Sequence, residues 1–117
     1  MSAALKNIVV FVTDLAKARS FYVDLLGLPV AGQSEMIIEF FPGAGTTMGV
    51  SLALHDDARA LVGRHTGISL KVENIVELCE KLKNGGATFA EPLESSPWGK
   101  MAVVRDFDGN LFALVDR

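Results

Sequence analysis

Hydrophobic positions in the first half of the chain change their spacing in a fixed order. The β-branched and aromatic run IVVFV at residues 8–12 predicts a strand. From Asp14 to Gly27 the apolar residues recur three or four positions apart, which predicts a helix that begins at Asp14 as its N-cap and ends at Gly27. Three more strands are predicted around the segments LPVAGQ, EMIIEFF and GVSLALH. The first half therefore has the order strand, helix and three strands.

The second half repeats this order. GISLKV predicts a strand, and a helix is expected from Asn74, with Glu77 completing a capping box, to the pair Gly85 and Gly86. Strands around ATFAEP, GKMAVVRD and NLFALVD follow. We predict an α+β fold of two tandem βαβββ modules, at about residues 5–56 and 65–117, within one domain that spans residues 1–117. The segment DDARALVGRHT is expected to connect the modules.

A comparison of the chain with itself supports the repeat. At an offset of 60 residues, identical residue types fall on Ile8 and Ile68, Val12 and Val72, Gly49 and Gly109, Ala53 and Ala113, Leu54 and Leu114, and Asp56 and Asp116. The alternation of side chains in the predicted strands adds a second signal. Ser51, Ala53 and His55 share one face of GVSLALH, and Ser69 lies on the matching face of GISLKV. Because these side chains are small or polar, we expect two curved mixed sheets that enclose a cleft.

Composition limits the classes of function. The chain has 117 residues, of which 50% are hydrophobic and 21% are charged, as in an ordinary globular domain. Its net charge of -3 argues against a nucleic-acid partner. No apolar run approaches the ~20 residues that span a bilayer, and the first residues do not resemble a signal peptide, so we expect no membrane partner and a cytoplasmic protein. The single cysteine, Cys79, lies in the apolar stripe of the second helix and is interpreted as a packing residue.

Three longer motifs resemble one known family. They are V-x-D-L-x-x-A-x-x-F-Y-x-x-L-L-G-L at residues 12–28, GISLKVENIVELCEKLKNGGA, and PWGKMAVVRDFDGNLFALVD. The chain resembles the vicinal oxygen chelate superfamily, which contains glyoxalases, bleomycin resistance proteins and dioxygenases, and the resemblance covers nearly the whole chain. It implies a divalent metal held by histidine or glutamine on the first strand of each module and by glutamate on the last.

At the positions that the resemblance assigns to the metal ligands, this chain has other residues. The first-strand positions are Asn7 and Gly67, and the last-strand positions are Ala113 and, by the repeat, Ala53. Only asparagine among these types has a side-chain oxygen, and a divalent cation needs three or more protein donors. The sequence therefore predicts no metal and no cofactor, and the resemblance then points to the metal-free branch typified by bleomycin resistance proteins.

A protein of that branch would bind a small molecule, such as an antibiotic-like or aromatic ligand, in a cleft lined by aromatic residues. Trp98, next to a glycine in a polar loop, is the strongest candidate for contact with a ligand, and Phe11 has the inward parity of its strand. Phe40 or Phe41 is a candidate for another wall. The full set of predicted ligand-binding residues is Asn7, Phe11, Glu39, Ala53, His55, Ser69, Trp98 and Ala113.

Three alternatives remain open at this point. A metal site built from Glu39, His55, His65 or Asp56 would make the protein a lyase or dioxygenase with unusual ligands. A cleft acid or base such as Glu39 or His55 would make it a metal-independent enzyme, and a cleft without a ligand would make it a scaffold or subunit. Asp106 and Asp108 in D-x-D-G-N are interpreted as turn residues rather than a catalytic pair. A homodimer is expected, since pairing is a common way to cover open sheet faces.

Overall fold

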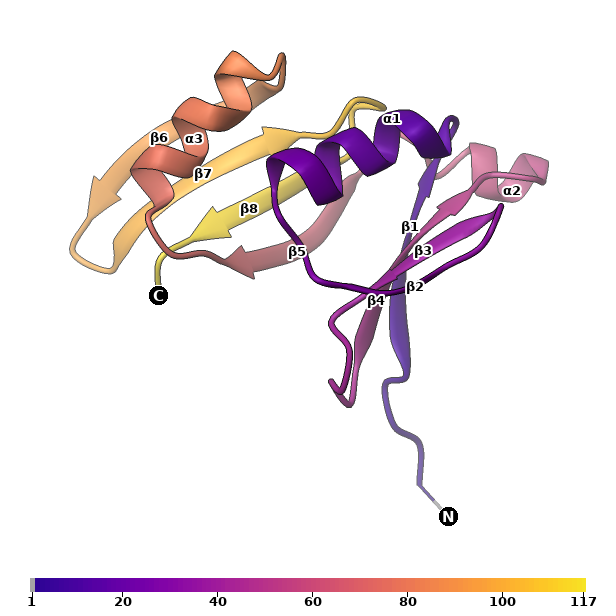
Figure 1. Ribbon diagram of the computed structural model, residues 1–117. Coiled ribbons are helices and arrows are strands. Elements are labelled where there is room, and N and C mark those ends of the chain that lie inside the picture. The colour runs from indigo at the N-terminus through magenta and orange to yellow at the C-terminus, as the bar shows by residue number, and fades with distance from the viewer. Residues whose placement is uncertain (1) are drawn as a thin grey trace. The chain divides into compact units, whose positions relative to one another are not determined.

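The computed structural model describes residues 2–117, which form two compact units (Figure 1). The first unit ends at Val62 and the second begins at Gly63. Each unit consists of a four-stranded mixed sheet with helical segments, in the order β-α-β-β-β. The predicted α+β fold of two βαβββ modules is therefore confirmed.

The first unit places its first and last strands side by side. Its elements are β1 (Asn7–Val12), α1 (Leu15–Arg19), the π-helix η1 (Ser20–Leu25), β2 (Val30–Gln33), β3 (Ile37–Phe40), β4 (Thr47–Leu52) and the short α2 (Asp56–Arg59). The strand order in the sheet is β1-β4-β3-β2, with β1 parallel to β4 and the other pairs antiparallel.

The helical segment of the first unit begins where the sequence predicts it. The Asp14 carboxylate accepts a hydrogen bond from the Lys17 backbone N–H at 3.0 Å, which is the N-cap interaction expected of an aspartate there. At Ser20 the backbone hydrogen-bonding pattern changes from that of an α-helix to that of a π-helix. The spacing of apolar residues does not predict this change. Gly27, in the left-handed conformation at φ 70°, follows the end of the helix.

The core of the first unit lies between the helical segment and one face of the sheet. Phe21 and Tyr22 pack edge to face with ring centroids 4.9 Å apart, and the Tyr22 ring lies 6.0 Å from that of Phe40. Phe40 is completely buried, so it belongs to this core and does not wall a cleft. The remaining buried apolar residues of this unit are Val10, Val12, Ala18, Leu26, Ile38, Met48 and Val50.

The second unit repeats this plan with longer strands. Its elements are β5 (His65–Lys71), α3 (Ile75–Asn84), β6 (Thr88–Ser96), β7 (Gly99–Arg105) and β8 (Leu111–Val115). The sheet order is β5-β8-β7-β6, with β5 parallel to β8. Ile75, Cys79 and Leu82 form the buried stripe of α3, as the spacing predicts. The predicted capping box is wrong, because Asn74 is in the left-handed region at φ 51° and its side chain makes no capping hydrogen bond.

The strand registers correct the predicted repeat. Val10 pairs with Val50 in the first unit and Leu70 with Leu114 in the second, so the first strands are 60 residues apart but the last strands are 64 apart. The position equivalent to Ala113 is therefore Gly49, and the predicted pairing of Ala53 with Ala113 is wrong. The difference arises in the hairpin before the last strand. Gly32 pairs with Glu39 across the β2–β3 hairpin, whereas Glu91 pairs with Val103 across the β6–β7 hairpin, so more residues separate the paired positions in the second unit. The longer hairpin carries Trp98.

The D-x-D-G-N turn before β8 is held by buried polar side chains. One Asp106 carboxylate oxygen accepts hydrogen bonds from the backbone N–H groups of Asp108 and Asn110, both at 2.9 Å. The Asn110 side chain donates to the other Asp106 oxygen and accepts from the Gly63 N–H at 2.8 Å. The interpretation as a turn satisfied by Asx hydrogen bonds is correct. The turn also fixes the first residue of the second unit.

No helix within residues 2–117 has the length and apolar character that crossing a membrane requires.

Candidate ligand-binding site

Each sheet has one face that the helix of its own unit does not cover. In the first unit this helix-free face carries Val9 and Phe11 of β1, Ile37 and Glu39 of β3, and Gly49 and Ser51 of β4. Residues on either side of them in the strands, such as Val10, Ile38 and Val50, are buried in the core, so alternation sends this set to the opposite face. Phe11 is half-buried and lies on this face, as its predicted parity requires.

Glu39 occupies the middle of the helix-free face of the first unit. Its strand, β3, pairs with β4 on one side and β2 on the other. Its cross-strand partners are Gly49 and Gly32, neither of which has a side chain. Glu39 is exposed, whereas Ile38 and Phe40 on either side of it are completely buried. The charge inside the apolar run MIIEFF therefore stands on a sheet face and not at a sheet edge.

The helix-free face of the second unit is built from equivalent positions. Ser69 of β5 pairs with Ala113 of β8, which pairs with Val103 of β7. Ser69 is exposed and Ala113 is half-buried. Their register shows that these two predicted site residues lie side by side on one sheet.

The positions where the family resemblance puts metal ligands do not fit a divalent metal. Asn7 is exposed at the start of β1, and Gly67 is exposed at φ 74° within β5. The last-strand positions given by the registers are Gly49 and Ala113. Ala53 lies just beyond β4, where its N–H donates to the Val12 carbonyl. One amide oxygen among these residues is far short of the three or more donors that such a site uses.

Trp98 forms part of a hollow at the tip of the β6–β7 hairpin. Its side chain is 83% exposed. The hollow has a volume of about 280 Å³, and its apolar walls are Trp98, Met101 and Val115, while Glu94 and Arg117 bring charges of opposite sign. Met101 and Val115 pair across β7 and β8 and lie two residues from Val103 and Ala113 in the same strands, so they share the helix-free face of the second unit and the hollow borders it.

The turn that presents Trp98 is tightly fixed. The Ser96 hydroxyl accepts a hydrogen bond from the Trp98 N–H at 3.1 Å and donates to the Gly99 carbonyl at 2.9 Å. Gly99 has φ 120°, and a Cβ atom there would lie 2.5 Å from the Asp116 carboxylate. That carboxylate accepts from the Lys100 N–H at 2.8 Å and so joins the turn to the end of β8. The indole is thus exposed on a rigid support.

His55 does not lie on a sheet face as predicted. β4 ends at Leu52, and His55 occupies the N-cap position of α2, where it is exposed and its side chain makes no capping hydrogen bond. The same break exposes Leu54, which alternation assigns to the core. The alternation of side chains does not extend to His55, because β4 ends three residues before it.

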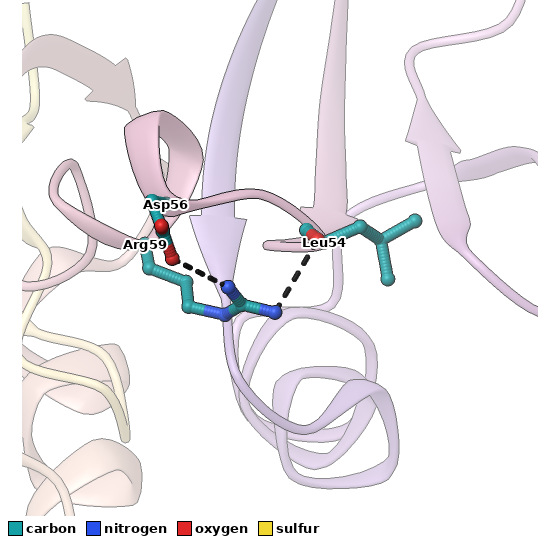
Figure 2. Close-up of polar contacts among 3 residues, drawn as sticks. All are labelled: Leu54, Asp56 and Arg59. Carbon is teal, nitrogen blue, oxygen red and sulfur yellow. Dashed lines mark hydrogen bonds and ion pairs between the residues drawn. The ribbon is translucent and has the colours of Figure 1, made fainter.

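Asp56, a candidate for a relocated metal site, already has a cationic partner. The Arg59 guanidinium donates to the Asp56 carboxylate at 2.9 Å and to the Leu54 carbonyl at 3.3 Å. Figure 2 shows both contacts as dashed lines. Both side chains of the ion pair are highly exposed, so its contribution to stability is small.

The remaining reactive groups are dispersed. Within residues 2–117, no three His, Cys, Asp or Glu side chains are grouped as metal ligands would be. His65 uses its Nδ1 to accept a hydrogen bond from the Gly67 N–H at 3.0 Å. Cys79 is buried, and burial raises the pKa of its thiol while nearby Lys83 lowers it by a smaller amount. A buried thiol of raised pKa is a poor nucleophile, in agreement with its interpretation as a packing residue.

Sequence reasoning missed most of the hollow around Trp98. Met101, Val115, Glu94 and Arg117 come from three different segments, and only the pairing of β6, β7 and β8 brings them together. A second hollow, of about 390 Å³, lies between the start of α3 and the side chains of Lys100 and Asp116. No signal in the residue pattern marks either hollow.

Comparisons with known proteins connect this geometry to a family. Residues 4–114 match the model of the Glyoxalase/Bleomycin resistance protein/Dioxygenase superfamily. A structure of a member of that superfamily from Sphaerobacter thermophilus DSM 20745 is 33% identical, covers 97% of both chains and superposes with a TM-score of 0.75. YetH of Bacillus subtilis (strain 168), an uncharacterized protein, is 26% identical over 92% of this chain and 93% of its own. TnmS3, an antibiotic binding protein from Streptomyces sp. CB03234, is 24% identical over 97% of this chain and 95% of its own, with a TM-score of 0.76.

Proposed function

Because the chain belongs to the Glyoxalase/Bleomycin resistance protein/Dioxygenase superfamily, we propose that it is a small-molecule binding protein that holds an aromatic ligand against Trp98 without a divalent metal. The observation that carries the proposal is the exposed indole at the hollow beside β7 and β8. An aromatic side chain held out by a rigid turn gives a ligand a large contact area at little cost in conformational entropy. TnmS3, which shares the fold, is an antibiotic binding protein, and this supports a ligand of antibiotic-like size and shape.

The chemistry of the hollow supports binding more than turnover. Met101 and Val115 give it an apolar wall, and the charged residues Glu94, Lys100, Asp116 and Arg117 also line it. Apolar walls with a few polar groups are typical of sites that bind small molecules. The residues at the family's metal positions supply no ligand set, so the proposed function has no step that passes through a metal.

Ligand titration tests the proposal directly. Trp98 is the only tryptophan of the chain, so a planar compound that stacks on it will change the intrinsic tryptophan fluorescence. Compounds that do so are then titrated by calorimetry against the Trp98→Ala protein. Truncating an aromatic residue at the centre of a binding site typically costs ~2 kcal/mol, so we expect affinity to fall about thirtyfold.

Two variants control this experiment. Trp98→Phe keeps an aromatic surface and should retain most of the affinity. Met36→Ala truncates another exposed apolar side chain, 52% exposed in the first unit, and should bind like the parent. Equal affinity of the parent and the Trp98→Ala protein would place the ligand elsewhere and overturn the proposal.

The metal-independent part of the proposal has its own measurement. Protein purified without chelators should contain no stoichiometric zinc, nickel, iron or manganese by elemental analysis, and EDTA should not change ligand affinity. A divalent metal present once per chain, with binding lost after its removal, would instead favour the metal-dependent lyase or dioxygenase.

A further inference from the structure

Glu39 is a carboxylate set among glycines and apolar side chains on the helix-free face of the first unit. On β4 its neighbour is Gly49, and on β2 its neighbour is Gly32. A Cβ atom at Gly49 would lie 3.0 Å from the Ile37 Cδ1 atom, which limits what this position can hold. A Cβ at Gly32 would meet no atom within 4 Å. The carboxylate is thus open to approach over β2, whereas the Ile37 and Val9 side chains fill the space over Gly49.

The surroundings of Glu39 supply it with no counter-charge. Val9 lies one strand beyond Gly49, and Ile37 and Phe11 lie in the next row of the sheet. All three apolar side chains are half-buried. Among residues 2–117, no side chain or backbone group forms a hydrogen bond or ion pair with the Glu39 carboxylate. Water is therefore its only source of hydrogen bonds in the free protein.

This arrangement discriminates between ligands by charge. A ligand that covers the apolar side chains removes water from the Glu39 carboxylate. Leaving a carboxylate without water or a partner is costly, so a neutral or anionic ligand is penalised. A ligand with an ammonium or guanidinium group replaces the lost hydrogen bonds with charge-assisted ones. Specificity then comes from rejection of the wrong charge as much as from attraction of the right one.

We propose that Glu39 is the charge-recognising residue of a subsite for organic cations, in which the apolar body of the ligand lies on Val9, Phe11 and Ile37 and its basic nitrogen contacts the carboxylate. The proposal rests on the small-molecule binding function given above and narrows the class of ligand to compounds with a basic nitrogen.

Three probes of equal size but different charge test it: 2-naphthylmethylammonium, neutral 2-naphthylmethanol and anionic 2-naphthoate. Binding is followed on the uniformly ¹⁵N-labelled full chain by the shifts of the amide resonances of Gly32, Glu39 and Gly49. The cation should move these resonances and bind about tenfold more tightly than the alcohol, and the anion should bind most weakly. The preference for the cation should shrink as salt concentration rises.

Glu39→Gln removes the charge while keeping the shape of the side chain, and it should bring the affinity for the cation down to that for the alcohol. Glu35→Gln is the matched control, because it removes the same charge from an exposed bend four residues earlier and should leave the preference unchanged. The proposal is overturned if the Glu39→Gln protein keeps the preference, or if the three probes bind equally well to the parent. It is also overturned if Glu39→Gln changes only the mass measured by light scattering, since the face would then be an interface between copies.

The outcome also separates this inference from the proposed function. If the probes perturb Trp98 fluorescence or any group of amides with no dependence on charge, the chain binds small molecules and only the role of Glu39 falls. If no probe changes any signal at millimolar concentration, both the charge-recognising subsite and general binding of aromatic compounds are contradicted.

Discussion

Gly99 allows the turn below Trp98 to form, because no other residue type fits its conformation and its space. Its φ of 120° lies in the region that side chains rarely adopt, and an added Cβ atom would meet the Asp116 carboxylate at 2.5 Å. The carboxylate cannot retreat without losing its hydrogen bond from the Lys100 N–H. In the sequence Gly99 resembles an ordinary turn residue, but in the structure it determines the position of the Trp98 indole.

We therefore expect Gly99→Ala to lower the free energy of unfolding by about 1–3 kcal/mol, from backbone strain and the lost contact. Urea denaturation followed by circular dichroism measures the change. Gly45→Ala is the control, since that glycine has neither a positive φ nor any atom within 4 Å of an added Cβ, and its effect should stay within about 0.5 kcal/mol. Similar effects of both substitutions would show that the Gly99 turn is not tight.

For single residues, the sequence predicts the chemistry of a side chain better than its place in the fold. The absence of donors at Gly67 and Ala113 can be recognised from residue types alone. Residue identities pair Ala53 with Ala113, whereas strand pairing makes Gly49 the equivalent position. Alternation predicts a sheet-face position for His55, because it does not reveal that the strand ends at Leu52.

The elements of the second unit are joined to its first residue through one turn. Asn110 is only 1% exposed, and its side chain links Asp106, which ends the β7 side of the turn, to the N–H of Gly63. The D-x-D-G-N motif therefore stabilises both the hairpin from β7 to β8 and the beginning of the unit.

Asn110→Ala should lower the free energy of unfolding by about 2 kcal/mol, because it removes the hydrogen bonds of a buried side chain to the Gly63 N–H and the Asp106 carboxylate. Thermal and urea denaturation both report the change. In the control Asn84→Ala, an exposed asparagine at the last position of α3 is replaced, and little change is expected. A loss no larger than that of the control would mean that water replaces the Asn110 side chain.

Strands and helices were predictable in order and approximate position, since apolar spacing alone distinguishes the two periods. Details that depend on hydrogen bonding were not. The spacing of apolar residues does not indicate the change from α1 to the π-helix η1 at Ser20. Asparagine is a favoured N-cap residue, but Asn74 has a left-handed backbone and its side chain makes no capping hydrogen bond. The longer β6–β7 hairpin was not predictable from the repeat, because identities at an offset of 60 residues continue beyond the second helix although the strands there are offset by 64.

For the whole molecule we predict a homodimer. Outside the proposed cation subsite, the apolar side chains of Leu5, Leu54 and Val76 are exposed in a single chain. Pairing of identical copies is the commonest way in which a small protein covers such a surface. Multi-angle light scattering over a dilution series should give a mass near twice the 12.5 kDa of one chain. A mass of 12.5 kDa at micromolar concentration would contradict the prediction.

The fold as a whole was recognisable because two signals agreed. The order strand, helix and three strands occurs twice, and the motifs at residues 12–28 and before β8 resemble the family that the comparisons confirm. The ligand was not recognisable, because the hollow beside Trp98 and the setting of Glu39 depend on which strands are neighbours. In such a site the strand register decides which residues are neighbours. Residue types alone give little information about that register.

The location of β1 bears on how the chain avoids aggregation while it folds. β1 lies at an edge of its sheet, and its sequence NIVVFV contains no charge and no proline. Such a segment is a template for intermolecular β-sheet whenever it emerges unpaired, and its partner strand β4 is synthesised some forty residues later. Lys6 and Asp14 flank the segment with opposite charges, and charges in these positions act as gatekeepers against fibril-like stacking. The aspartate that caps α1 is thus also the charge that bounds this aggregation-prone segment at its C-terminal end.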